Sequence, residues 1–139
     1  MNEDYVILRK ILKIGNGLIK NRNKSLLEHK LTSEQSVTLQ YLDAHPGASA
    51  SDLKEYLNIS HQAARNIVER MKNKGLLYSA VSKEDARIKS VYLTEKGLEA
   101  FNIVKDEGTK LENQILSCLT DEEKETLHGL IDKISCNIS

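Results

Sequence analysis

The chain has 139 residues, 40% of them hydrophobic, and its 20 Lys and Arg residues balance its 20 Asp and Glu residues. This length fits one domain, with or without extensions, and the apolar content is enough for a core. No apolar run approaches the ~20 residues that span a bilayer, and residues 1–15 lack the order of regions of a signal peptide, which predicts a cytoplasmic protein.

The neutral total hides an uneven distribution of charge. Residues 1–30 carry seven Lys or Arg against three Asp or Glu, and residues 60–97 carry eight against four. Residues 31–59 and 98–139 hold the compensating excess of acidic side chains. Two segments are therefore cationic, so a neutral total does not argue against a nucleic-acid partner.

An amphipathic helix is predicted over residues 4–20, where apolar side chains recur at helical spacing. The stripe consists of Ile7, Ile11, Ile14 and Leu18, with Leu8, Leu12 and Ile19 beside it. It is wide for a terminal helix, so we expect it to pack against more than one neighbour. Residues 21–24 interrupt the apolar pattern.

Residues 32–59 predict two short helices in succession. Thr32 and Gln35 fit a capping box for the first helix, which ends before the only proline of the chain. Ser49 is expected to cap the second helix, over residues 50–57. Its inward-facing residues are predicted to be Leu53, Tyr56 and Leu57.

A longer helix is predicted from a cap at Ser60 to a left-handed glycine at Gly75, and a tight turn joins it to the helix before it. This order is typical of a helix-turn-helix. One face is apolar. The cap and the opposite face offer hydrogen-bonding groups of the kind that contact bases: Ser60, His61, Gln62, Arg65, Asn66 and Glu69. In an isolated helix such a face is more often only a solvated surface.

A β-hairpin is predicted next, with strands over residues 76–81 and 89–93 around a polar tip at residues 82–87. The tip and its flank carry four charged candidates, Lys83, Asp85, Arg87 and Lys89. A tip of this composition cannot enter a core. It must project into solvent or against something negatively charged, which favours DNA binding by the preceding helix as well.

Two helices are predicted to complete the chain. Thr94 caps one that reaches Leu119, roughly 39 Å at 1.5 Å per residue, and a second capping box at residues 120–123 begins the other. Both ends of the chain therefore carry more apolar surface than one small lobe can cover. We expect an isologous dimer built from residues 4–20 and about 100–138.

Several segments together resemble the multiple antibiotic resistance regulator (MarR) family. They are the LTSEQ start, the ISHQAARNIVERMKNKGLL helix, the wing with Asp85-Ala86-Arg87, the LTEKG that follows it and the acidic LTDEE. The resemblance covers nearly the whole chain, and its most specific part is the Asp-x-Arg wing followed by LTEKG.

The resemblance implies a mainly α (α+β) fold, a winged helix-turn-helix over residues 31–97 between dimerisation helices at 1–30 and 98–139. It implies a homodimeric transcription regulator, a repressor on an inverted-repeat operator in double-stranded DNA, relieved by a small aromatic or phenolic effector. Arg87 would enter the minor groove, oriented by Asp85, while the helix from Ser60 lies in the major groove. Arg65 and Asn66 depart from the Thr/Ser-Arg of many members, so no operator sequence can be transferred.

Other readings carry less weight. The four histidines lack i, i+4 pairing and no cysteines have CxxC spacing, so we expect no metal site, and no motif indicates an enzyme or a cofactor. Cys118 and Cys136 are expected to be inert core thiols rather than redox sensors. The remaining alternative is a winged helix that binds protein instead of DNA.

Overall fold

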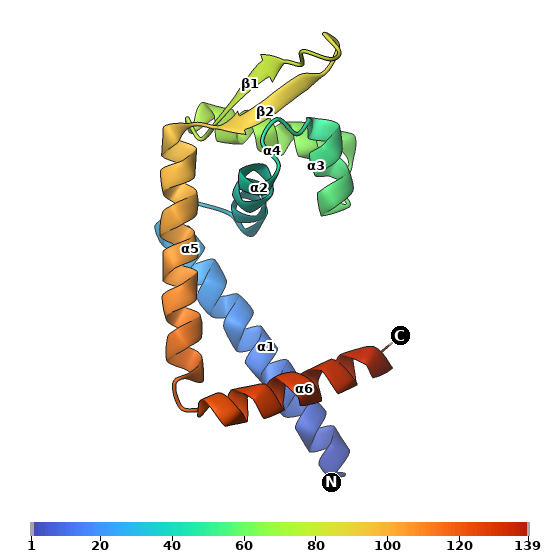
Figure 1. The fold of residues 1–139 in the computed structure, drawn as a ribbon, viewed down its shortest axis with the longest axis vertical. Coiled ribbons are helices and arrows are strands. Elements are labelled where there is room, and N and C mark those ends of the chain that lie inside the picture. Colours follow the sequence, from blue (N-terminus) through green and yellow to red (C-terminus); the bar gives the residue numbers. More distant parts are fainter. Residues whose placement is uncertain (1, 139) are drawn as a thin grey trace. The chain divides into compact units, whose positions relative to one another are not determined.

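A computed structural model describes residues 2–138, which leaves residues 1 and 139, the outer ends of the predicted terminal regions, outside the description. The described chain is mostly helical with one antiparallel two-stranded sheet, which confirms the predicted fold class (Figure 1). Its elements are α1 (Glu3–Glu28), α2 (Ser33–Ala44), α3 (Ala50–Leu57), α4 (His61–Asn73), β1 (Leu77–Val81), β2 (Lys89–Leu93), α5 (Glu95–Leu116) and α6 (Asp121–Asn137). Among the described residues, no helix combines the length and the apolar character needed to cross a membrane.

Side-chain caps begin the helices where the sequence predicts them. The Thr32 hydroxyl accepts from the Gln35 backbone N–H at 3.1 Å, and Gln35 Oε1 accepts from the Thr32 N–H at 3.3 Å. The same reciprocal pattern starts α6, between Thr120 and Glu123. Ser49, predicted as a simple cap, also forms a full capping box, because the Asp52 carboxylate accepts from its N–H at 2.9 Å.

The helix predicted over residues 4–20 is longer in the structure, because α1 continues to Glu28. Residues 21–24 are exposed, so their polar side chains interrupt the apolar stripe without interrupting the backbone. The helix is held at its far end by Leu26, which is 2% exposed, and it ends where Lys30 adopts a left-handed φ of 57°. The N-terminal stripe itself is exposed, with Ile11 at 44% and Ile14 at 62%.

The chain divides after Lys105 into two compact units, and the first contains α1 to β2 and the start of α5. Its core is aliphatic, and helices α2, α3 and α4 and the sheet contribute to it. The buried side chains include Leu39, Leu42, Leu53, Ile67, Val68, Met71, Leu77 and Val91. Tyr56, predicted to face inward, is 52% exposed, since its ring lies against Tyr41 at the surface, with centroids 4.5 Å apart.

The second unit contains the end of α5 and all of α6, and no residue of α6 is buried. Its apolar side chains include Leu130, which is 51% exposed, and Ile131, which is 48% exposed. The prediction of buried thiols was wrong, because Cys118 and Cys136 are both exposed and Cys118 lies after the end of α5.

Candidate nucleic-acid interface

Helix α4 is fixed by its apolar face. Ala64 and Met71 are fully buried, and Ile67 and Val68 are less than 10% exposed, so one side of the helix cannot rotate away from the core. The Ser60 hydroxyl caps the helix by accepting from the Ala63 N–H at 3.0 Å. The buried stripe therefore fixes which side chains the opposite face presents to solvent.

The structure places all the predicted side chains of α4 on that exposed face. They are His61, Gln62, Arg65, Asn66 and Glu69. Two of them bond along the helix: Gln62 Nε2 donates to Asn66 Oδ1 at 3.0 Å, and Glu69 lies 3.5 Å from Lys72 Nζ. The Lys72 contact partly offsets the negative charge of Glu69. Arg65 is exposed and makes no ion pair with any described residue.

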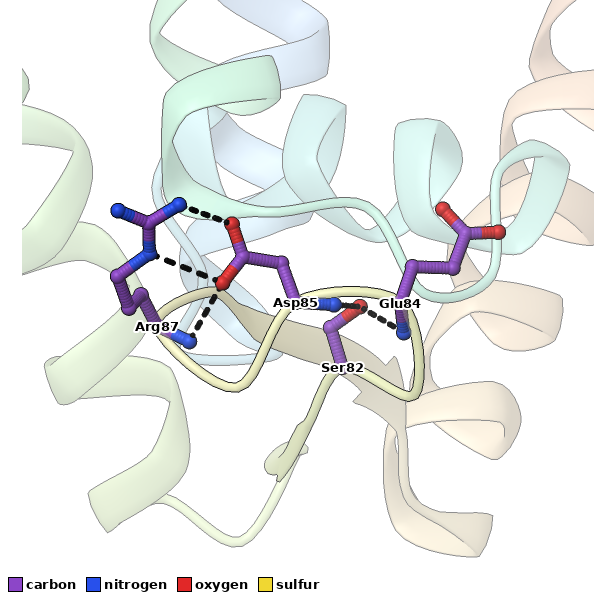
Figure 2. A network of polar contacts seen from close by, with 4 residues as sticks. All are labelled: Ser82, Glu84, Asp85 and Arg87. Atoms are coloured by element: carbon purple, nitrogen blue, oxygen red, sulfur yellow. Dashed lines mark hydrogen bonds and ion pairs between the residues drawn. The ribbon is translucent and has the colours of Figure 1, made fainter.

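The wing consists of β1, β2 and the loop between them. It carries a two-point ion pair at its tip (Figure 2). Arg87 Nε lies 3.1 Å from Asp85 Oδ1, and Nη2 lies 3.1 Å from Oδ2. The Arg87 backbone N–H also donates to Oδ1, at 3.0 Å. These hydrogen bonds from Arg87 lower the pKa of the Asp85 carboxyl below its ordinary value of 3.8. The guanidinium therefore has a defined direction although it lies on an exposed loop.

Sequence reasoning missed the contribution of Ser82 to this tip. Figure 2 shows its hydroxyl oxygen accepting from the backbone N–H groups of Glu84, at 3.3 Å, and Asp85, at 3.5 Å. The Ser82 N–H donates to the Ile88 carbonyl at 2.8 Å and closes the loop. Serine commonly stabilises such turns, so the residue type at the start of the tip was an available signal. Lys83 and Lys89 are exposed on either side.

A second set of hydrogen bonds joins the C-terminal end of α4 to distant parts of the first unit. Lys74 Nζ donates to the Lys30 carbonyl at 2.6 Å and to Oε1 of the buried Gln35 at 2.9 Å. The Thr94 hydroxyl donates to the Gly75 carbonyl at 2.6 Å. These bonds connect residues that are 19 to 44 positions apart, so no local pattern in the sequence predicts them.

The described residues offer no group of three His, Cys, Asp or Glu side chains that could hold a metal ion. The chemistry of the exposed face of α4 and of the wing is instead that of hydrogen-bond donors, acceptors and cations. Such groups suit base edges and phosphates.

Comparison with known proteins agrees with this geometry. Residues 29–88, from the loop before α2 to the residue after Arg87, match the model of the MarR family. The helix-turn-helix and wing segment of this chain therefore resembles the MarR family. Helices α3 and α4 with the hairpin of β1 and β2 form a winged helix-turn-helix, which this match covers as far as the loop before β2.

Three comparisons, one with YybA and two with structures of MepR, illustrate the likeness. The chain is 27% identical over 132 residues to YybA of Bacillus subtilis (strain 168), described as an uncharacterized HTH-type transcriptional regulator; the match covers 95% of this chain and 88% of YybA. It superposes with a TM-score of 0.85 on MepR, a transcription regulator of the Staphylococcus aureus multidrug efflux pump MepA, at 23% identity over 100% of both chains. A MepR variant bound to an oligodeoxyribonucleotide gives a TM-score of 0.74 at 25% identity, covering 97% of this chain and 98% of that one.

Proposed function

We propose that this chain is a homodimeric repressor that occupies an inverted-repeat operator, with α4 in the major groove and Arg87 in the minor groove of each half-site. The observation that carries the proposal is the pairing of an exposed hydrogen-bonding face on α4 with a wing arginine held in direction by Asp85. A helix that only faces solvent would not require an oriented arginine on the wing beside it. The DNA bound to the MepR variant supports the same use of the fold.

The dimer is supported by apolar side chains that the single chain leaves uncovered. In α1 only Leu26 is buried, and the stripe that includes Ile7 and Leu18 is 44–62% exposed. In α6, Leu127, Leu130, Ile131 and Ile134 are 37–51% exposed. Apolar surface of this extent marks an interface, and a second copy of the chain supplies a complementary partner. We assign dimerisation to residues 1–30 and 98–139 and DNA binding to residues 31–97.

A twofold dimer makes a geometric prediction about its DNA site. Two copies of α4 related by a twofold axis fit half-sites about one helical turn, roughly 10 base pairs, apart. A footprint on the DNA flanking the protein's own gene should show two protected half-sites with inverted sequence. Protection without twofold symmetry, or none at all at a saturating protein concentration, would contradict the proposal.

Relief by a small aromatic or phenolic effector completes the proposal, and it rests on the family resemblance. In the cytoplasm, such a ligand would bind preferentially to a form of the dimer in which the spacing of the two α4 helices does not match the operator. Binding would shift the dimer to that form and release the DNA. A panel of small phenols titrated into the preformed complex with DNA should release the operator. Operator affinity unchanged by every phenol would remove this part of the proposal and leave DNA binding intact.

A further inference from the structure

Gln62 and Asn66 lie one helical turn apart on the exposed face of α4, and their side-chain amides are joined. Gln62 Nε2 donates to Asn66 Oδ1 at 3.0 Å. Both residues are exposed, while Ala64, Ile67 and Val68 hold the other side of the helix in the core. The amide pair is therefore displayed outward from a helix that cannot turn.

The direction of this hydrogen bond determines what each amide has left to offer. A primary amide carries two N–H donors and one carbonyl acceptor. Gln62 spends one N–H on Asn66. When this is the N–H that points away from the Gln62 carbonyl, the other N–H lies beside the carbonyl oxygen and the two can contact one base together. The Asn66 carbonyl oxygen already accepts from Gln62, so Asn66 turns mainly its two N–H donors to solvent. Gln62 thus presents an adjacent donor and acceptor, and Asn66 presents donors.

Only one base offers the complement of an adjacent donor and acceptor in the major groove. Adenine shows the N7 acceptor next to the N6 amino donor, whereas guanine shows two acceptors, N7 and O6. Cytosine shows a donor alone, and thymine shows an acceptor beside a methyl group. A glutamine placed on guanine would leave its carbonyl oxygen facing another acceptor, which is costly once water is excluded.

We infer that Gln62 reads an adenine in each half-site and that Asn66 is a positioning residue that holds the Gln62 amide in the reading orientation. The inference rests on the proposed function, since it needs α4 in the major groove. Gln62 lies in the first turn of α4, the part of a recognition helix that reaches base edges. Glutamine loses much rotamer freedom when it is fixed, so a contact that orders it before binding removes part of that cost.

The test begins with enrichment of bound sequences from a random duplex library by the full-length protein. Wild-type protein should enrich an A·T pair at one position of each half-site, and Gln62→Ala should lose the preference there while the rest of the motif persists. Gln40→Ala is the matched control, because Gln40 is an exposed glutamine on α2. It should enrich the wild-type motif.

Base analogues then test the two hydrogen bonds separately. Replacing the adenine by 7-deazaadenine removes N7, and replacing it by purine removes the N6 amino group. Each should weaken binding of the wild type about 2- to 13-fold, the range for the loss of one hydrogen bond. Neither should change the affinity of Gln62→Ala by more than about twofold, since that variant has no amide to lose.

Asn66 variants test the positioning role. The preference is measured as the affinity for the duplex with adenine at the contacted position divided by the affinity for duplexes with another base there. Asn66→Ala should reduce this ratio without changing which base is preferred. Asn66→Asp keeps an oxygen that accepts from Gln62 Nε2, so it should restore that ratio. Its overall affinity should stay lower, because it places a negative charge near phosphates. The ratio separates orientation from a general loss of stability or of charge.

The possible failures are distinguishable. Absence of any enriched motif with wild-type protein would contradict the proposed function itself. An enriched motif that is the same for Gln62→Ala would overturn the inference and leave the function standing. A base preference that changes identity in Asn66→Ala would show that Asn66, not Gln62, makes the contact, and an Asn66→Asp ratio equal to that of Asn66→Ala would overturn the positioning role.

Discussion

Arg87 and Asp85 meet at two points, with Nε 3.1 Å from Oδ1 and Nη2 3.1 Å from Oδ2, while the Arg87 side chain remains 89% exposed. The carboxylate fixes the direction of the guanidinium without covering it. An exposed ion pair of this kind adds little to folding stability. In the proposed complex its contribution would be to DNA binding, because less conformational freedom is lost when an already ordered arginine enters a groove.

Replacing Asp85 tests whether it acts by orientation or by charge. Asp85→Asn removes a negative charge from a surface that we propose to face phosphate, so charge alone would tighten DNA binding. Orientation predicts the opposite, since the neutral amide cannot hold the guanidinium with the same two-point contact. We expect weaker operator binding in a fluorescence anisotropy titration, and an unchanged thermal midpoint. Tighter binding would show that Asp85 has no positioning role.

The lowered pKa of Asp85 determines the pH range in which the ion pair between Asp85 and Arg87 forms. A carboxyl whose folded-state pKa lies below its ordinary value of 3.8 contributes above that pH and loses the contribution as pH falls through the lower value. Operator binding should therefore not titrate through Asp85 between pH 5 and 8. The carboxyl resonance should give a pKa below 3.8 by NMR, and Arg87→Ala should move it upward. A pKa that is the same in both proteins would show that the pair does not form in solution.

The junction between β1 and α5 predicts a stability effect at a single glycine. A Cβ at Gly97 would overlap the Leu76 carbonyl, whose carbon lies 3.1 Å away, whereas a Cβ at Gly108 in the same helix would meet nothing within 4 Å. Gly97→Ala should cost about 1–3 kcal/mol in free energy of unfolding. Gly108→Ala should be neutral or stabilise by up to about 1 kcal/mol through helix propensity. Equal effects in urea denaturation would contradict the close packing at Leu76.

The uncovered stripe on α1 predicts that dimerisation depends on it. Deleting residues 1–20 should give monomers or insoluble protein, and Ile11→Glu should shift sedimentation towards the monomer because it places a charge on the apolar stripe. Asn21→Glu, at an exposed position of the same helix, is the control. A soluble dimer of full DNA affinity after the deletion would place the interface elsewhere.

Local chemistry explains which parts of the fold the sequence could predict. The boxes at Thr32 and Thr120 and the left-handed Gly75, with φ of 77°, need only neighbouring residues, and all three are confirmed. The wing strands also follow from a local pattern. Burial and long-range contacts were less predictable: Tyr56 is half exposed, and both thiols are exposed.

In the candidate site, too, local features could be predicted from the sequence and long-range contacts could not. Residue types identified the exposed face of α4 and the charged wing tip, but spacing alone could not show that Gln62 donates to Asn66 rather than accepting from it. The contact of Lys74 with Gln35 joins residues 39 positions apart, so it depends on the folded arrangement of α2 and α4. Direction and distance, which determine specificity, come from the structure.

In the proposed complex, a dimer places two cationic wings and two α4 helices on one DNA duplex. The most direct test is the salt dependence of binding to the operator and to a scrambled duplex, by the wild type and Arg87→Ala. If each subunit neutralises about three or four phosphates, the wild-type log-log slope should be roughly −5 to −7. Arg87→Ala should lose about 1–3 kcal/mol and keep its preference among major-groove bases. A wild-type slope near −1 with equal affinity for both duplexes would contradict DNA binding through the wings and α4.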